Sequence, residues 1–263
     1  MRRLEGRAHY LDSFLGELKR REHLRLLRDW GALVPRSRLL KTDLFEEAVG
    51  PDALLDALHA EVGEAHAIDV SAAVVQRARR RLGAARALCQ VADVRELPYA
   101  DGSFSTVLST STLDHFEDPA DLGKSLREIR RVLAAGGRLV ITLDNRQNLF
   151  DPLLRLASRL GWSPYYLGRS YRVDELRREL TAAGFEVEAT TAILHNPRMV
   201  AVGAVRLARW SRIPALVTAV ERLLLEAQRL ERTRWRYSTG SFVAAVARRA
   251  DRPRAGIAHA GGH

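Results

Sequence analysis

Acidic and hydroxyl side chains gather at the ends of apolar runs in one stretch of the chain, residues 91–145. The stretch reads VADVRELPYADGSF, STVLSTST and LDHFEDP, and after a short helical segment it continues as REIRRVLAAGGRLVITLDN. The pattern predicts strand, loop, strand, helix, Gly-Gly turn and strand. Open α/β sheets bind ligands beyond the carboxyl ends of their strands, so the polar residues at these ends are the first candidates for chemistry.

Asp114 and His115 follow the fourth expected strand, which covers residues 106–109. An imidazole titrates near neutral pH, and a carboxylate within reach raises its basicity. One interpretation is therefore a general base in which Asp114 supports His115. The alternative is that the histidine packs in the fold and that the two neighbours in sequence do not touch.

Polar residues also follow the next two strands. Asp144 and Asn145 end the fifth expected strand, and His195 and Arg198 follow the sixth. Parallel strands open their carboxyl ends on one side of a sheet, so all four are expected beside the Asp-His pair. The set suits binding of a hydroxylated or anionic substrate and removal of a proton from an oxygen or nitrogen atom, with His195 as a further candidate catalytic residue. Each residue taken alone can equally be a cap or turn residue.

The elements that position these residues alternate between strand and helix. Strands are expected from residue 38 and at 65–70, 87–91, 106–109, 138–143 and 185–191, with helices after 51, from 71, and at 121–133 and 173–183. Strands that alternate with helices of this length need right-handed crossovers and form a parallel sheet covered on both faces. Before them, residues 11–30 carry leucines at helical spacing, which predicts an amphipathic extension that ends before Pro35.

The alternation stops between His195 and Ser238. Two helical stretches, MVAVGAVRLARW and IPALVTAVERLLLEAQRLERTRW, come first, and GSFVAAVARRA then reads as a last strand. We therefore divide the chain into five parts. They are a helical extension (1–37), a core (38–192), a helical insert or lid (193–237), a last core strand (238–250) and a tail (251–263) whose composition predicts disorder.

Composition narrows the classes of function. The net charge of +10 comes almost wholly from arginine spread along the chain, and no basic run has the interleaved aromatics of single-strand binders, so nucleic-acid binding is disfavoured. Cys89 is the single cysteine, and the one His-x-x-x-His pair, His259 and His263, lies in the tail, so neither a disulfide nor a metal site is expected in the core. No apolar run of roughly 20 residues and no signal-peptide core occur, which favours a cytoplasmic location.

Three signatures in the central stretch carry a family resemblance: D-x-x-x-L-P-Y from Asp93, D-G-S-F from Asp101 and R-V-L-x-x-G-G from Arg131. Together they resemble the second half of a class I S-adenosylmethionine-dependent methyltransferase core of the small-molecule type. The resemblance covers residues 38–192 and 238–248. It implies a Rossmann-like α/β fold, which is a doubly wound, mostly parallel seven-stranded sheet with an antiparallel last strand. An N-terminal helical extension and a helical insert before the last strand complete the expected architecture.

The resemblance implies S-adenosylmethionine as cofactor. In this family an acid at the end of the second strand accepts hydrogen bonds from both ribose hydroxyls, a place that Asp69 takes here, with Val70 beside it. A carboxylate at the end of the third strand accepts from the adenine amine while the next main-chain N–H meets the ring, which corresponds to Asp93 and Val94. Ser109 ends the fourth strand, next to the expected position of the transferred methyl group.

The first loop departs from the family pattern, in which an acid and Gly-x-Gly-x-Gly let the backbone approach the methionine part of the cofactor. Here LLKTDLFEEAVG has no glycine before Gly50, and Lys41 stands in the place of the acid. One hypothesis is that Asp43 meets the cofactor ammonium, with Glu46 or Glu47 nearby and Lys41 pairing with the carboxylate. The alternative is a non-catalytic scaffold or partner subunit that no longer binds the cofactor.

Two further segments bear on the methyl acceptor. GWSPYYLGRSY lies where this fold carries substrate-recognition loops, and Tyr165 and Tyr166 either line a planar or apolar substrate site or cover the loop's own core. The insert helices combine an apolar side with many arginines, so they either pack on the core or make peripheral contact with a membrane. The prediction is methyl transfer to an oxygen, nitrogen or carbon nucleophile of a small or lipid-like metabolite. The acceptor and the oligomeric state stay open.

Overall fold

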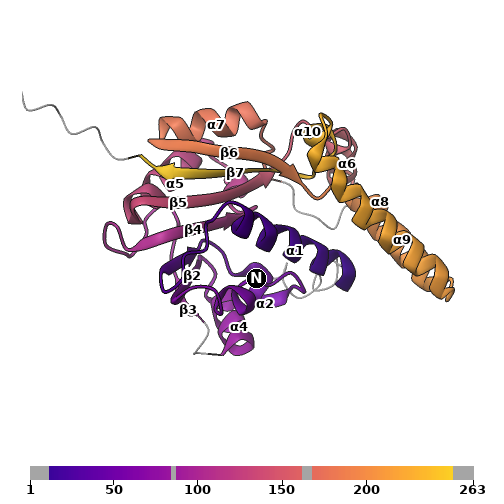
Figure 1. Cartoon of the computed structure of the whole chain (residues 1–263), viewed down its shortest axis with the longest axis horizontal. Coiled ribbons are helices and arrows are strands. Elements are labelled where there is room, and N and C mark those ends of the chain that lie inside the picture. Colours follow the sequence, from indigo (N-terminus) through magenta and orange to yellow (C-terminus); the bar gives the residue numbers. More distant parts are fainter. Residues whose placement is uncertain (1–11, 84–86, 162–167, 251–263) are drawn as a thin grey trace, which may run out of the picture.

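The apolar runs of the sequence form one seven-stranded sheet in the computed structural model, which describes residues 12–83, 87–161 and 168–250 (Figure 1). The strands are β1 (Arg38–Lys41), β2 (Glu64–Asp69), β3 (Leu88–Val91), β4 (Phe104–Thr110), β5 (Leu133–Asp144), β6 (Phe185–Ile193) and β7 (Phe242–Arg249). Their order is β3-β2-β1-β4-β5-β7-β6, and β7 runs antiparallel to both of its neighbours while the other pairs are parallel. The expected doubly wound, mostly parallel sheet with an antiparallel last strand is confirmed.

Helices bury both faces of this sheet. They are α1 (Ser13–Asp29), α2 (Phe45–Val49), α3 (Leu55–Leu58), α4 (Ala72–Leu82), α5 (Ala120–Val132) and α7 (Val173–Ala182). Neighbouring strand residues point to opposite faces. Thus Leu40 and Ile141 join the core under α5 and α7, while Leu39 and Val140 join the core under α1 to α4. This explains why the central strands read as continuous apolar runs.

The N-terminal extension is a helix that lies on the sheet rather than apart from it. Leu18 and Leu26 of α1 are buried in a small core with Phe242 of β7. Gly16 lets the helix approach the loop before α3, since a Cβ at this position would fall 2.2 Å from Pro51 Cγ. The extension is therefore packed against the same region that follows β1.

Two short helices lie where the sequence suggested none. The first strand ends at Lys41 and α2 begins at Phe45, so the loop between them has only three residues. A further helix, α6 (Asp151–Arg159), follows β5 in a region without an expected element. Its segment DPLLRLASR has leucines at helical spacing and a proline in its first turn, which are helix signals.

The insert between β6 and β7 forms a helical hairpin. Its elements are α8 (Arg198–Trp210), α9 (Pro214–Ala227), η2 (Gln228–Arg232) and α10 (Arg236–Thr239). In Figure 1, α8 and α9 lie along each other and project away from the sheet. At the base of the hairpin, Leu15 of α1 packs with Val202, Val205 and Leu224. None of the helices in the described ranges is long and apolar enough to cross a membrane.

Candidate functional site

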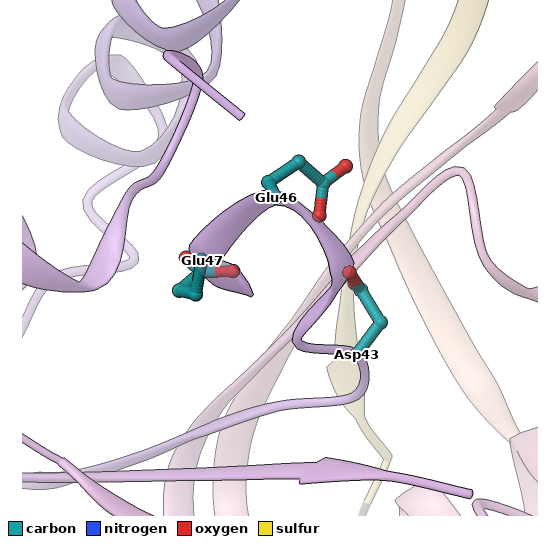
Figure 2. Close-up of side chains that lie close together, drawn as sticks. All are labelled: Asp43, Glu46 and Glu47. Carbon is teal, nitrogen blue, oxygen red and sulfur yellow. The ribbon is translucent and has the colours of Figure 1, made fainter. Parts of the chain in front are cut away.

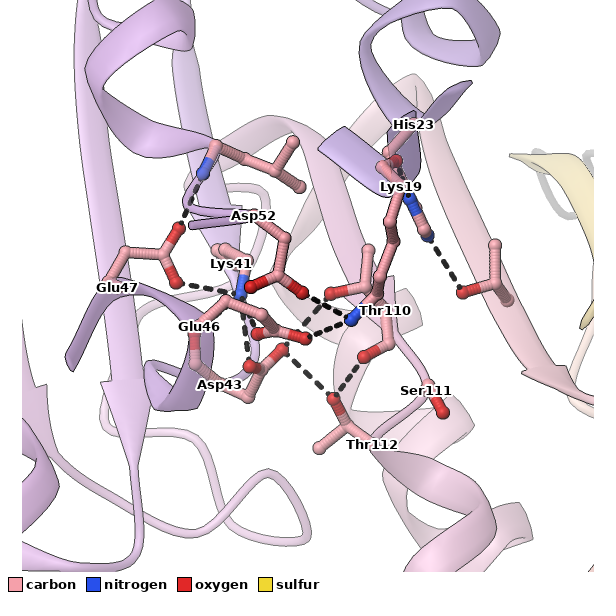
Figure 3. A network of polar contacts seen from close by, with 12 residues as sticks. Lys19, His23, Lys41, Asp43, Glu46, Glu47, Asp52, Thr110, Ser111 and Thr112 are labelled. Atoms are coloured by element: carbon pink, nitrogen blue, oxygen red, sulfur yellow. Dashed lines mark hydrogen bonds and ion pairs between the residues drawn. The ribbon is translucent and has the colours of Figure 1, made fainter. Parts of the chain in front are cut away.

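A buried charge cluster follows β1, in the place of the expected glycine-rich loop (Figure 3). Lys41 is fully buried, and its Nζ lies 2.9 Å from Asp43 Oδ1, 3.1 Å from Glu46 Oε2 and 3.0 Å from Glu47 Oε2. Burial alone lowers the pKa of Lys41, but these carboxyl groups raise it well above its ordinary value, so the lysine stays charged. Lys41 is the counter-ion of this loop, which corrects the expectation that it pairs with a cofactor carboxylate.

The three acids around Lys41 have the spacing of a cation site. One oxygen from each of Asp43, Glu46 and Glu47 lies within 4.8 Å of the other two (Figure 2). The ammonium of Lys41 contacts all three side chains and supplies the positive charge that such a triad needs. We therefore assign the triad to the lysine.

Helix α1 supplies a second cation to this cluster. Lys19 Nζ lies 2.7 Å from Asp52 Oδ2 and 3.1 Å from Glu46 Oε1. Burial opposes ionisation of Glu46, but the ammonium groups of Lys41 and Lys19 hold its pKa well below the usual range. Burial and the Glu46 carboxylate raise the pKa of Asp43 well above its usual value. Four carboxyl groups face two ammonium groups here, so negative charge is in excess by one when Asp43 is protonated and by two when it is ionised.

Asp69 lies at the end of β2, where the resemblance places the ribose. Its Oδ1 accepts the N–H of Ser71 at 2.8 Å and its Oδ2 accepts the N–H of Leu44 at 3.2 Å, so it joins the start of α4 to the loop after β1. Burial raises the pKa of Asp69, although the side chain is partly exposed. Each oxygen keeps a second lone pair for a ligand. Beside it, Val70 is 69% exposed and offers an apolar surface at the same edge.

Asp93 follows β3, next to β2, because Val91 of β3 is in register with Asp69. Its carboxylate accepts hydrogen bonds from the Arg95 guanidinium, at 2.6 Å from Nη2, and from the Arg95 main-chain N–H at 2.8 Å. These hydrogen bonds lower the pKa of Asp93. Val94, between them, is buried. A ligand amine would therefore share Asp93 with Arg95, a partner that the sequence did not suggest.

Two hydroxyl groups near the ends of β1 and β4 lack hydrogen-bond partners among the described residues. Ser109 and Thr42 are both buried, and neither side-chain oxygen is bonded. Leaving a buried polar group unpaired costs about 1–3 kcal/mol, so such groups mark a place that a ligand or water completes. Together with Asp69, the exposed Val70 and the excess negative charge, they fit a nucleoside joined to a positively charged amino acid, which is the chemistry of S-adenosylmethionine.

The structure brings Asp114 and His115 together after β4. Asp114 is fully buried; its Oδ2 accepts the N–H of Asp144 at 2.8 Å, and its Oδ1 lies 4.0 Å from His115 Nε2. Burial, followed by the Asp144 carboxylate, raises the pKa of Asp114 to about 6. The His115 side chain is 38% exposed. Gly168 lies over the pair, where a Cβ would fall 1.9 Å from the Asp114 carbonyl oxygen.

Asp144 and Arg198 form an ion pair at the ends of β5 and β6. The Arg198 guanidinium also lies 4.2 Å from the ring centroid of Phe242. Asn145 has a different role, since its side-chain amide donates to the carbonyls of Tyr237 and Gly240 and orders the chain that enters β7. These three expected substrate residues thus line one site, where Asp144 and Arg198 are ion-paired and Asn145 also holds the backbone.

His195 is placed inside the fold. Its Nδ1 lies 2.8 Å from the Thr239 hydroxyl and its Nε2 lies 2.9 Å from the Ala192 carbonyl, and burial lowers its pKa. Both ring nitrogens are thus used by the protein, which corrects the expectation of a catalytic role and leaves His115 as the candidate base. Tyr165 and Tyr166 lie outside the described residues, as does the tail from residue 251.

An open pocket begins at this ion pair and extends between α6 and the first turn of α8. Its polar end includes Asp144, Arg198 and Ser241. Its apolar side includes Phe150, Leu153, Leu154, Met199 and Val200. The sequence located the polar end and the helix that carries Met199 and Val200, but it missed the rest of the apolar side because α6 had not been recognised as a helix.

Comparisons with known proteins find methyltransferases among the proteins similar to this chain. A family model described as "Methyltransferase domain" matches residues 46–141. An uncharacterized protein of Mycobacterium tuberculosis (strain ATCC 25618 / H37Rv) is 32% identical over 172 residues, 65% of this chain and 56% of that protein. A probable S-adenosylmethionine-dependent methyltransferase of Mycolicibacterium smegmatis is 29% identical over 150 residues, 57% of this chain and 52% of that protein. The chain thus spans about half the length of these relatives.

A solved structure of geranyl diphosphate methyltransferase in complex with SAM has the same fold. Its TM-score is 0.57 at 16% identity, over 90% of this chain and 87% of that one. The sheet order and the matched family model lead to the same assignment. The chain carries a methyltransferase domain at residues 46–141 and has the fold of the S-adenosylmethionine-dependent methyltransferases.

Proposed function

We propose that this chain binds S-adenosylmethionine at the carboxyl ends of β1 to β4 and transfers its methyl group to a small or lipid-like acceptor. The observation that carries the proposal is the position of the open pocket. Asp144 lies at the polar end of the pocket, and its main-chain N–H donates to the Asp114 carboxylate. Asp114 is next to His115, the histidine that we assign to this edge. An acceptor in the pocket would thus meet the cofactor edge beside His115.

Different residues at the carboxyl ends of the strands bind different parts of the cofactor. Asp69 holds the ribose hydroxyls, Val70 covers an apolar face, and Asp93 accepts from the adenine amine. The excess negative charge behind Asp43 and Glu46 attracts the cofactor ammonium, in place of the missing glycine loop. When bound, the cofactor supplies an electrophilic methyl group.

His115 accepts at its ring the proton that the nucleophile loses, and Asp114 orients that ring. Holding the acceptor in line with the methyl group provides the remainder of the rate enhancement. Because Oδ1 of Asp114 has no hydrogen-bond partner among the described residues, it can strengthen its contact with the ring when His115 becomes charged.

The pocket supports an acceptor with an apolar part and a polar head. Leu153, Met199 and Val200 suit an isoprenoid or acyl chain, and Arg198 with Asp144 suits a hydroxylated or anionic group. The solved relative is named for geranyl diphosphate, which combines such parts.

Calorimetric titration with S-adenosylmethionine and S-adenosylhomocysteine tests the proposal. We expect Asp69→Asn to weaken binding about 10- to 100-fold, because a hydrogen bond to a charged group contributes about 1.5–3 kcal/mol. Asp101→Asn is the matched control, since Asp101 is exposed and pairs with Arg131 before β4. If the folded wild-type chain binds neither compound at millimolar concentration, the non-catalytic scaffold is the correct assignment.

A further inference from the structure

Two helices beside the pocket carry apolar side chains that the described residues leave exposed. On α6, Leu153 and Leu156 are 62% and 53% exposed. Leu160, which follows α6, continues the same face, because the three leucines are spaced by three and then four residues. On α8, Val200, Leu207 and Trp210 share one helical face and are at least half exposed. Both rows begin at the pocket, since Leu153 and Val200 line it.

The exposed row of α8 reaches the tip of the hairpin. Trp210 is 80% exposed there, and Ile213 in the following turn is 53% exposed. The opposite side of α8 is ordinary core, because Val202 and Val205 are buried against α1 and α9. We call the exposed row the arm surface, defined by Val200, Leu207, Trp210 and Ile213.

The same part of the chain is strongly basic. Residues 198–236 contain nine arginines and three glutamates, a net charge of +6 (9 − 3). Two of these arginines, Arg198 and Arg209, pair with Asp144 and Asp12 from outside the segment, which leaves a net charge of +4 (6 − 2). A surface that combines exposed leucine and tryptophan with arginine has the composition of a helix that lies in a membrane interface.

We propose that the arm surface binds an anionic phospholipid membrane, with Trp210 at the level of the headgroups. An indole suits this depth because it is apolar with one polar N–H, and each basic residue near an anionic surface adds attraction. This interaction goes beyond methyl transfer and does not require it. It also sets the pocket mouth beside the lipid, so that a lipid-like acceptor, if the proposed function holds, can enter without crossing water.

Charge separates this occupant from two others. A second copy of the chain would bring a second basic arm against the first, and like charges repel. The phosphates of a nucleic acid would pair with the arginines, but the leucine and tryptophan side chains would stay in contact with phosphate and water. An anionic lipid surface provides both interactions: its headgroups attract the arginines, and its apolar interior takes up the leucine and tryptophan side chains.

Co-sedimentation of the full chain with vesicles tests the proposal. We expect binding to phosphatidylglycerol–phosphatidylcholine vesicles at low salt, weaker binding at high salt, and little binding to pure phosphatidylcholine. The double variant Leu207→Ser, Trp210→Ser should bind at least about tenfold more weakly, because two apolar side chains no longer leave water. Leu88→Ser is the matched control: Leu88 is 52% exposed, but it lies on β3 at the other edge of the sheet.

Three outcomes would overturn the proposal. They are no sedimentation of the wild type with anionic vesicles at low salt, equal binding by the double variant, and a wild-type dimer that the double variant converts to monomer. Thermal unfolding of each variant checks that it is folded. Titration with S-adenosylmethionine in the absence of vesicles is a separate readout, so failure here and failure of the proposed function are distinguishable.

Discussion

The two ends of the functional edge are built in opposite ways. At the β1 end, Lys41 and Glu47 are charged groups that the fold has removed from water. Beyond the β6 end, on the projecting hairpin, Leu207 and Trp210 are apolar groups that the fold has left in water. Buried charges and exposed apolar patches both depart from the usual distribution of residues, and each requires a reason.

This difference indicates which kind of partner each end is suited to bind. Buried charge is costly unless it is paired, so the β1 cluster fixes its own geometry before any ligand arrives. Exposed apolar surface is favourable only when something covers it, so the hairpin is complete only with a partner. The first end is suited to hold a small charged molecule in one position, and the second is suited to a surface.

The largest expected effect is on stability at the buried end. Lys41→Met would leave the carboxyl groups of Asp43, Glu46 and Glu47 without their central cation, and breaking a buried ion pair from one side costs about 3–5 kcal/mol. Urea unfolding measures this loss. Lys124→Met is the control because Lys124 is half exposed and makes a surface pair with Asp121. Equal losses in the two variants would contradict the role assigned to Lys41.

A smaller effect, dependent on pH, is expected midway along the edge. Asp114 has a folded pKa of about 6 against an ordinary value of 3.8, so the folded state holds the proton more tightly. The free energy of unfolding should therefore fall as pH rises from about 4 to 6, and level off above. Asp114→Asn should remove about 1–3 kcal/mol of this decline. Urea unfolding at pH 4.5 and pH 7 measures it, with the exposed Asp118→Asn as control.

The smallest effect is expected at the exposed end. Leu207→Ser should change the free energy of unfolding by less than about 0.5 kcal/mol, because this side chain is already in water. Val205→Ala on the opposite side of α8 should lose about 1–3 kcal/mol, since Val205 is 1% exposed and a cavity replaces its methyl groups. Comparable losses would show that Leu207 is covered within the protein, and the contrast between the two ends would disappear.

Sequence reasoning located the residues that end strands because a strand end follows from local pattern. Asp69, Asp114 and Asp144 all lie at the edge where they were expected, and the antiparallel last strand was expected as well. The helix expected from residue 71 is also present as α4, and Ser71 caps it by accepting the N–H of Val74. These features depend on periodicity and on rules for parallel sheets, both of which act over short segments.

What side chains do at those positions could not be predicted. Lys41 and Asp43 are two residues apart, and their pairing depends on a backbone turn that the missing glycines gave no reason to expect. The part of Lys19 depends on a contact between residues 33 positions apart in the chain. His195 was expected at an open edge, but Thr239, which binds its ring, comes from the other end of the insert.

Helix α1 contacts both the hairpin and the charge cluster after β1, through residues about one helical turn apart. Leu15 is packed under the hairpin, and Lys19, four residues later, is bonded into the charge cluster. Four residues of helix span about 6 Å, and a helix is stiff over that length. The extension therefore connects the two regions rigidly. If the hairpin moves when it binds a surface, α1 should move Lys19 relative to Glu46. Deleting α1 would disconnect the two ends and impair both, whichever of them is assayed.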